Sequence, residues 1–408
     1  MVQETIEQLF HEEFSKMVAV ISKRYGLSNI QLAEGVVSET FVQAAETWGI
    51  EGLPANPTAW LYLVAKRKAM YHFRREKIFH DKVSPELSLR RQQDDQIHGP
   101  DFTLQNINDS QLQMLFAVCH PAIASEAQIG LALRTLCGFG IDEIAEAFLS
   151  NKDTINKRLY RARKKLRTEN IKMELPPEDE ITSRLDNVLH IIYLLFNEGY
   201  YSKIQKQILQ KDLCLEAMRL GMILTEHEET NQPKTNALVA LMCFHASRFE
   251  ARQSTEDSII LYDRQSAALW DRALIRQGMH FLERSAEGNE VSSYHLEARI
   301  AYWHCIKEDT SEKWGEILHL YDQLLKVNYS PNAALNRIYV LYKVKGTVVA
   351  IAEAEKLDLE ESHFYFVLLG ELCTGIDNKK AEKYLQKALS LAKTHTDQQT
   401  IQKKIDEL

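Results

Sequence analysis

The stretch LCGFGIDEIAEAFLSNKDTINKRLYRARKKLR, residues 136–167, decides the fold class of the first part of this chain. Its last helix, which runs to about Arg167, has one apolar stripe made of Ile155, Leu159, Ala162 and Leu166. At about 100° per residue, its cationic residues fall on the opposite side. A shorter helical pattern at 142–148 precedes it, and the break at 149–151 separates the two, with Ser150 and Asp153 placed as a capping box. This order of elements predicts a helix-turn-helix.

In a helix-turn-helix the first turns of the second helix reach base edges, and later cations meet phosphates. Arg163 and Arg167 are expected among the phosphate contacts. The other residues of this helix that we expect to contact DNA are Thr154, Asn156, Lys157, Arg158, Arg161, Lys164 and Lys165. The alternative is a solvated basic helix with no ligand. The preceding break and the clean segregation of charge favour DNA binding.

A second basic stretch, KRKAMYHFRREKIF at 66–79, interleaves cations with aromatic side chains. Cations hold a nucleic-acid backbone, while flat rings stack on unpaired bases, at about 1–3 kcal/mol per base. The composition therefore suits single-stranded or melting DNA. The residues that we expect to contact it are Trp60, Lys66, Arg67, Lys68, Tyr71, His72, Phe73, Arg74 and Arg75. The alternative is that Phe73 or Trp60 simply belongs to the core.

Residues 1–79 read as a compact three-helix unit. Patterns at 5–25 and 30–49 predict two amphipathic helices, and Asn56-Pro57 opens a third that ends near Lys77. In the second helix, the acids Glu34, Glu39 and Glu46 are expected to fall away from an apolar stripe. The polar stretch 80–108 has no sustained period and predicts a flexible linker, after which 109–170 forms the helix-turn-helix unit.

Residues 177–408 read as helix after helix with short polar connections, which predicts an irregular helical-repeat domain. Near its end, Leu369-Gly370 followed by Ala381, Leu385 and Ala388 approximates the spacing of a tetratricopeptide unit. The net charge of −8 lies entirely beyond residue 170, because residues 1–170 hold 21 basic and 21 acidic side chains. The whole chain is therefore predicted to be all-α, with a neutral first part and an acidic second part.

Other functional classes find little support. The start has no signal-peptide pattern and no apolar run is long enough to span a membrane, so a cytoplasmic protein is expected. The six dispersed cysteines fit reduced thiols, and Cys119-His120 has no second ligand pair, so no metal or cofactor is expected. No catalytic motif is present, which predicts a protein that is not an enzyme. The polar runs at 197–200 and 262–272 predict a buried ion-pair joint or, alternatively, a ligand pocket.

With these residues in hand, the chain resembles an extracytoplasmic-function sigma factor. The resemblance rests on EGVVSETFVQAAETW (34–48) and NPTAWLYLVAKRKAMYHFRREK (56–77) as region two, and on the helix-turn-helix as region four. The stretches LDNVLHIIYLLFNEGYYS (185–202) and DRQSAALWDRALIRQG (263–278), with the helical repeats, are similar to a subgroup with a fused tetratricopeptide-like domain. The sequence departs from the family pattern at Gly35, Ser38, Arg67 and Tyr71.

The resemblance implies a partner and a division of labour. The second helix would dock on the core of bacterial RNA polymerase, with contacts expected from Glu34, Glu39, Phe41 and Glu46. Region two would melt and read the minus-ten element, and region four would read the minus-thirty-five element as duplex DNA. The repeat domain would regulate activity, folding back toward the basic surfaces or binding a regulatory protein or ligand. The alternatives are an operator-binding helix-turn-helix regulator that does not bind polymerase, and a chaperone-like peptide binder.

Overall fold

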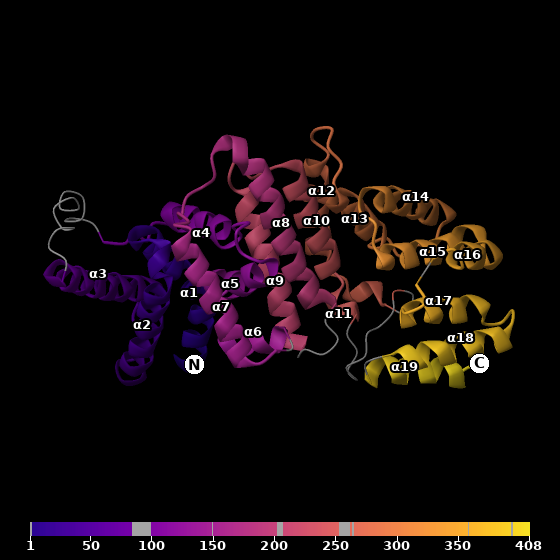
Figure 1. The fold of residues 1–408 in the computed structure, drawn as a ribbon, viewed down its shortest axis with the longest axis horizontal. Coiled ribbons are helices and arrows are strands. Elements are labelled where there is room, and N and C mark those ends of the chain that lie inside the picture. The colour runs from indigo at the N-terminus through magenta and orange to yellow at the C-terminus, as the bar shows by residue number, and fades with distance from the viewer. Residues whose placement is uncertain are drawn as a thin grey trace. The chain divides into compact units, whose positions relative to one another are not determined.

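A computed structural model describes residues 2–83, 99–148, 150–201, 207–252, 262, 265–357, 359–392 and 395–408. All regular structure in these ranges is helical, and they contain no strand, so the predicted all-α class is confirmed (Figure 1). The chain divides into two compact units, unit 1 at Met1–Thr235 and unit 2 at Asn236–Leu408. Unit 1 therefore extends past the predicted start of the repeat domain at 177.

Unit 1 holds the two basic helices and the first hairpin of the predicted repeat domain. Its main helices are α1 (Val2–Tyr25), α2 (Ile30–Glu51), α3 (Pro57–Val83), α4 (Leu104–Val118), α5 (Ser125–Leu136), α6 (Ile141–Ala147), α7 (Lys152–Thr168), α8 (Glu178–Tyr201) and α9 (Gln207–Thr225). A one-turn 3₁₀ helix, η1 (Leu27–Asn29), joins α1 to α2.

Helix α1 is the centre of unit 1, because it packs against α2, α3, α4 and α5. Its buried side chains include Phe14, Met17 and Ile21, each without exposed surface. The predicted region-two helices and the predicted region-four helices therefore share one core through α1. This shared core was not expected from the sequence, which placed a flexible linker between two separate bodies.

Local signals located the start of α3 but not its end or the capping residue of α7. The Asn56 side chain accepts a hydrogen bond from the Ala59 backbone N–H at 3.0 Å, as predicted for the start of α3. Helix α3 continues to Val83, and α4 begins at Leu104, so the described ends of the predicted linker are helical. The predicted capping residue of α7 was wrong: Asn151, not Ser150, accepts from the Thr154 N–H at 2.8 Å. The middle of the predicted linker, 84–98, lies outside the described residues.

Unit 2 consists of helices that pack mainly on their neighbours in the chain. They are the end of α10 (Pro233–Ala246), then α11 (Phe249–Arg252), η4 (Ala267–Leu269), α12 (Arg272–Ser285), α13 (Ser293–Trp303), α14 (Ser311–Val327), α15 (Pro331–Lys345), α16 (Thr347–Ala354), α17 (His363–Cys373), α18 (Asn378–Leu391) and α19 (His395–Asp406). Contacts between successive helices from α12 to α19 are the arrangement expected of a helical-repeat domain.

The tetratricopeptide-like spacing corresponds to a real helical hairpin, α17 and α18. Gly370 of α17 lies so close to α18 that an added Cβ would sit 2.7 Å from Leu385 Cγ and 3.4 Å from the Ala381 carbonyl oxygen. Ala381, Leu385 and Ala388 are all buried. The small residues therefore allow the close approach of two helices that the spacing predicted.

Candidate nucleic-acid interface

Helix α7 presents a cationic face to solvent. Its buried stripe is made of Ile155, Leu159, Ala162 and Leu166, as predicted, and it packs on α5 and α6. On the opposite side, Lys157, Tyr160, Arg161 and Lys164 are all exposed. Fixing the apolar stripe on two helices holds the cationic face in one orientation, which is what a groove-reading helix requires.

Ion pairing within unit 1 separates the cations of α7 into two sets. Carboxylates hold four of them: Lys152 with Asp142 at 2.5 Å, Arg158 with Glu126 at 3.0 Å, Arg163 with Glu34 at 2.6 Å and Lys165 with Glu169 at 2.7 Å. Lys157, Arg161, Lys164 and Arg167 are exposed and make no such pair with any described residue. These four cations are therefore the ones most available to neutralise phosphates.

The first turn of α7 is also exposed to solvent. Asn151 caps the helix through the Thr154 backbone N–H, and the side chains of Thr154 and Asn156 are exposed. A helix-turn-helix places this turn nearest the base edges. The predicted base contacts of this turn are therefore accessible to a ligand. Arg163, which was also expected to contact phosphate, is only 11 % exposed and pairs with Glu34 inside unit 1 rather than facing solvent. Arg158 lies 5.7 Å over the Phe148 ring and contacts Glu126, so it is restrained as well.

Helix α3 is only partly open for stacking. Tyr71 is 64 % exposed, and Arg67, Arg74 and Arg75 are exposed beside it, while Lys66 is half-buried. The other predicted rings, Trp60, His72 and Phe73, are half-buried. Phe73 stacks on Tyr25 with ring centroids 3.7 Å apart, and Trp60 meets the edge of Trp48 at 5.2 Å. Tyr71 is thus the most exposed of the predicted rings, and the ring contacts of Phe73 and Trp60 favour the alternative of a packing role for these two.

Helix α2 carries the predicted polymerase contacts on two different sides. Glu39 and Glu46 are exposed and, with Ser38, Val42, Gln43, Thr47 and Lys68 of α3, line a shallow groove. His72 and Lys68 of α3 approach Glu39, at 3.4 and 3.8 Å. Phe41 is buried against Phe10, with ring centroids 5.1 Å apart, so it supports the helix from behind.

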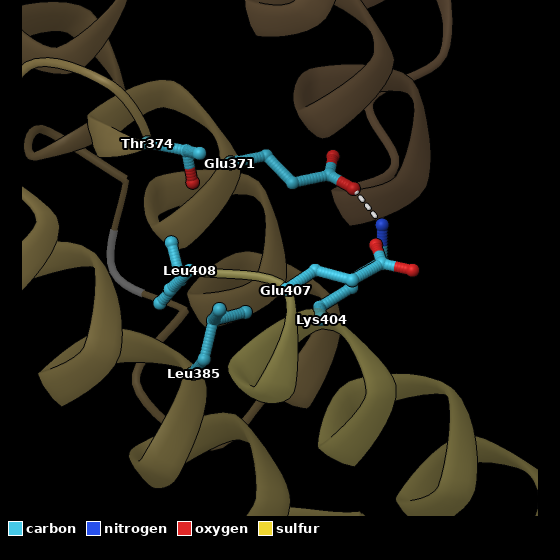
Figure 2. A pocket seen from close by; sticks show the side chains of 6 residues that line it. All are labelled: Glu371, Thr374, Leu385, Lys404, Glu407 and Leu408. Atoms are coloured by element: carbon cyan, nitrogen blue, oxygen red, sulfur yellow. Dashed lines mark hydrogen bonds and ion pairs between the residues drawn. The ribbon is translucent and has the colours of Figure 1, made fainter.

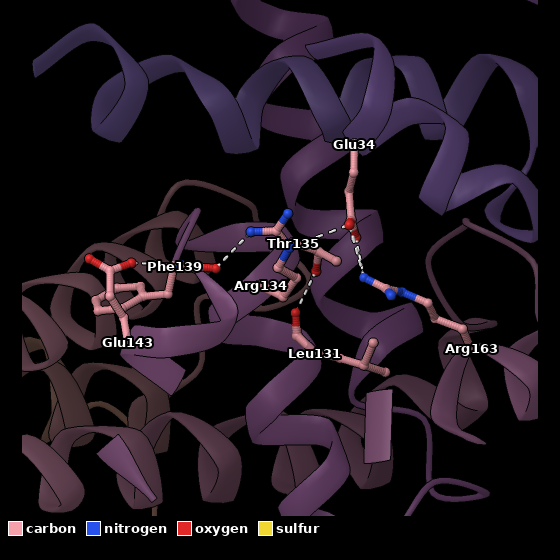
Figure 3. A network of polar contacts seen from close by, with 8 residues as sticks. Glu34, Leu131, Arg134, Thr135, Phe139, Glu143 and Arg163 are labelled. Carbon is pink, nitrogen blue, oxygen red and sulfur yellow. Dashed lines mark hydrogen bonds and ion pairs between the residues drawn. The ribbon is translucent and has the colours of Figure 1, made fainter. Parts of the chain in front are cut away.

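Glu34 corrects an expectation. It was predicted to fall away from the apolar stripe of α2, but it is only 6 % exposed and faces the interior. Its position, three residues before Val37, continues the buried stripe by one step. Its carboxylate contacts Arg134 of α5 and Arg163 of α7 (Figure 3). The spacing of Glu34 could have revealed its burial; its arginine partners, 100 and 129 positions away, could not be read from it.

Helices α8 and α9 contact the ends of α4 and α5. Arg184 donates to the Phe116 carbonyl oxygen at 2.9 Å, and Asn187 donates to the Cys119 carbonyl oxygen and to Gln128 Oε1. Arg219 of α9 donates to the Leu136 carbonyl oxygen at the end of α5. These side chains satisfy carbonyl groups that helix ends leave without partners. Sequence patterns gave no sign of these bonds, because hydrogen bonds to distant backbone carbonyls leave no periodicity.

The polar run at 262–272 belongs to a cation–aromatic joint of unit 2. Lys307 and Lys313 each place Nζ 4.9 Å from the centroid of the Tyr262 ring, and Lys313 also donates to the Tyr262 hydroxyl at 2.8 Å. Asp271 caps α12 by accepting from the Ala273 and Leu274 backbone N–H groups. Asp263 and Arg264 lie outside the described residues. The described part of this run therefore makes cation–ring contacts and a helix cap, and it shows none of the ion pairs that were predicted for it.

Unit 2 also has a shallow pocket between α17, α18 and α19, lined by Glu371, Thr374, Leu385, Lys404, Glu407 and Leu408 (Figure 2). Lys404 pairs with Glu371 across it.

The six cysteines are buried and free, and burial raises the pKa of the Cys119 thiol to about 12. Within the described ranges, no group of three or more His, Cys, Asp or Glu is placed to hold a metal ion. None of the helices in these ranges is long and apolar enough to cross a membrane.

Comparison with known proteins gives two similarities. Residues 184–286 match a family described as a family of unknown function (DUF6596). This stretch begins in α8 and ends after α12, so it takes in parts of both units. An uncharacterized protein of Rhizobium meliloti (strain 1021) is 29 % identical over 386 residues, which cover 93 % of this chain and 90 % of that protein. No solved structure matches the chain.

Proposed function

We propose that this protein is an RNA polymerase sigma factor, which directs the core enzyme to specific promoters and has no catalytic activity of its own. The observation that carries the proposal is the face of α7, where Lys157, Arg161 and Lys164 are exposed and make no ion pair with a described residue. A rigidly held helix of this kind fits the major groove. Tyr71 and the exposed arginines of α3 supply the second, ring-bearing surface for a melted strand.

The exposed acids of α2 support a polymerase contact. Glu39 and Glu46 border a groove with an exposed apolar residue, Val42, at its edge. An acidic and partly apolar helix face fits a basic partner surface. In this proposal the helical repeats of unit 2 regulate activity, through a regulatory protein or ligand, and the protein works in the cytoplasm where polymerase is found.

The test is reconstitution with core bacterial RNA polymerase on fragmented genomic DNA, followed by mapping of transcript starts. We expect a restricted set of starts that share two sequence elements, and we expect the double variant Lys157→Ala/Arg161→Ala to abolish it. The matched control is Lys172→Ala, because Lys172 is an exposed lysine just beyond α7. Starts that do not differ from those of core enzyme alone would reject the proposal.

A second candidate function is an operator-binding regulator that does not bind polymerase. The burial of Glu34 and Phe41 favours it, because two of the four predicted polymerase contacts are not on the surface. This candidate predicts specific binding to closed duplex in the absence of core enzyme. The sigma factor proposal predicts promoter opening only when core enzyme is present, so the same reconstitution separates the two.

A further inference from the structure

A single carboxylate joins the two parts of unit 1 that were expected to act separately on DNA. Arg163 Nη2 of α7 donates to both oxygens of Glu34 in α2, at 2.6 and 2.9 Å, and Arg134 Nε of α5 donates to Oε2 at 3.3 Å (Figure 3). Arg134 is itself held by a hydrogen bond to the Phe139 carbonyl oxygen at 3.0 Å. Region-two-like and region-four-like helices are thus linked by one three-residue cluster, which we name the Glu34 cluster.

The Glu34 cluster is largely shielded from water. The side chains of Glu34, Arg163 and Arg134 are 8 %, 11 % and 19 % exposed. A shielded charge is costly unless its partners are in place, so neutralising Glu34 leaves two shielded arginines without a counter-charge. Such a cluster selects one arrangement of the helices more than it adds net stability. It therefore acts as a latch: the attraction between Glu34 and the two arginines is strong while the cluster is shielded and weak once water reaches it.

The closed arrangement conflicts with simultaneous reading of two promoter elements. Elements about 25 base pairs apart lie about 85 Å apart along B-DNA at about 3.4 Å per base pair. In unit 1, by contrast, α2 and α7 are in direct contact through the Glu34 cluster. The exposed face of α7 remains accessible in this state, so binding to one isolated duplex element does not require opening. Binding to both elements does.

We propose that the Glu34 cluster is the latch of a closed resting state of unit 1, which must open before both DNA-binding surfaces can engage one promoter. The latch itself follows from the contacts, while its consequence for transcription rests on the proposed function. Opening separates α2 from α5 and α7 and exposes Glu34, Arg134 and Arg163 to water together. The shared core on α1 opens in the same step, because α4 and α5 pack on α1 as well.

The first experiment measures opening directly in the full-length protein. Spin labels on cysteines introduced at the exposed positions Ala45 of α2 and Thr168 of α7 report the distance between the two helices by pulsed electron paramagnetic resonance, while the native cysteines are buried. We expect one narrow distance distribution for the parent protein. Glu34→Gln keeps the shape and removes the charge, and we expect it to add a longer, broader population. An unchanged distribution in Glu34→Gln overturns the proposal.

Two further variants guard against simple misfolding. Arg163→Gln should open unit 1 less than Glu34→Gln does, because Arg134 still neutralises Glu34. The double variant Glu34→Gln/Arg163→Gln should open it less than the two single effects combined, because it leaves Arg134 as the one shielded charge of the cluster, whereas Glu34→Gln alone leaves two. Helix content measured by circular dichroism must stay at the parent level. If the double variant opens by the full sum of the single effects, the two residues act independently and the latch is rejected.

The second experiment links opening to transcription. With core polymerase, we expect Glu34→Gln to raise promoter-specific initiation about tenfold, the size of a typical coupling between sites. Its affinity for a duplex carrying only the element read by α7 should stay within about twofold of the parent, because that face is already exposed. If the labels report opening but no variant supports initiation, the latch stands and the proposed function fails. If initiation occurs but Glu34→Gln leaves it unchanged, the regulatory role fails.

Discussion

Gly370 shows how one missing side chain sets the spacing of two helices. An alanine Cβ there would lie 2.7 Å from Leu385 Cγ, so Gly370→Ala forces α17 and α18 apart and should lower the free energy of unfolding by about 1–3 kcal/mol. Gly315 of α14 is the matched control, because no atom lies within 4 Å of an added Cβ there. Gly315→Ala should raise stability by about 0.5–1 kcal/mol. Urea unfolding followed by circular dichroism measures both, and equal effects of the two substitutions would refute the argument.

His295 makes unit 2 sensitive to acid. Its Nδ1 accepts from the Ser292 backbone N–H at 3.1 Å, a bond that requires the neutral ring, and its Nε2 donates to the Ser285 carbonyl oxygen at 3.1 Å, a bond that either form of the ring can make. Burial lowers the pKa of His295 below its usual 6.5. The stability from His295 is therefore present above pH 6.5 and is lost as the pH falls below it, by at most about 1.4 kcal/mol per pH unit.

The variant His295→Gln tests this prediction. Glutamine can accept from the same backbone N–H in a capping box but does not titrate. Urea midpoints measured at pH 7.5 and 5.5 should fall further in the parent protein than in His295→Gln. Equal losses in the two proteins would mean that another group controls the acid sensitivity.

At the scale of single residues, the sequence predicted positions that depend on local periodicity better than those that depend on distant partners. The exposure of Lys157, Arg161 and Lys164 follows from their angle to the apolar stripe, which is local information. Glu34 was misplaced because a charged residue is normally assigned to the surface. Its burial depends on Arg134 and Arg163, two partners that come together only in the folded unit.

Helix α7 is the element whose function can be tested most directly. Binding of the full-length protein to a duplex should weaken as salt rises, and each lost phosphate contact should reduce the slope of log K against log salt by about 0.9. We expect this reduction for Arg161→Ala and for Lys164→Ala, and no reduction for Lys172→Ala. Fluorescence anisotropy at several salt concentrations gives the slopes. Slopes for Arg161→Ala and Lys164→Ala that equal the slope of the parent protein would show that these residues of α7 do not contact the phosphates.

At the scale of elements, patterns of apolar residues located most helices but not their partners. The α6–α7 pair and the α17–α18 hairpin were both visible as local patterns, and both exist. The packing of α1 on both halves of unit 1 was not visible, because periodicity says which face of a helix is buried and not against what. The same reason hid the attachment of α8 and α9 to α4 and α5.

For the whole molecule, the division at Thr235 changes how a truncation should be designed. Ending the chain at residue 176 removes Arg184, Asn187 and Arg219, which bond carbonyl groups at the ends of α4 and α5, and uncovers the apolar faces of these two helices. Ending it at residue 232, just before α10, keeps these contacts. We expect the shorter fragment to unfold at a lower urea concentration and to bind duplex poorly, through loss of structure.

The longer fragment, residues 1–232, isolates the role of unit 2. If the acidic unit 2 restrains the basic surfaces, this fragment should bind duplex DNA more tightly than the full chain at low salt, and the difference should shrink toward 0.5 M salt as charges are screened. If unit 2 is instead required for activity, the fragment should bind duplex normally but fail to initiate transcription with core polymerase. The fragment keeps the contacts of α8 and α9 with α4 and α5, so any change in its activity comes from the loss of unit 2. Equal affinity and equal initiation in the fragment and the full chain would therefore mean that unit 2 has no regulatory role.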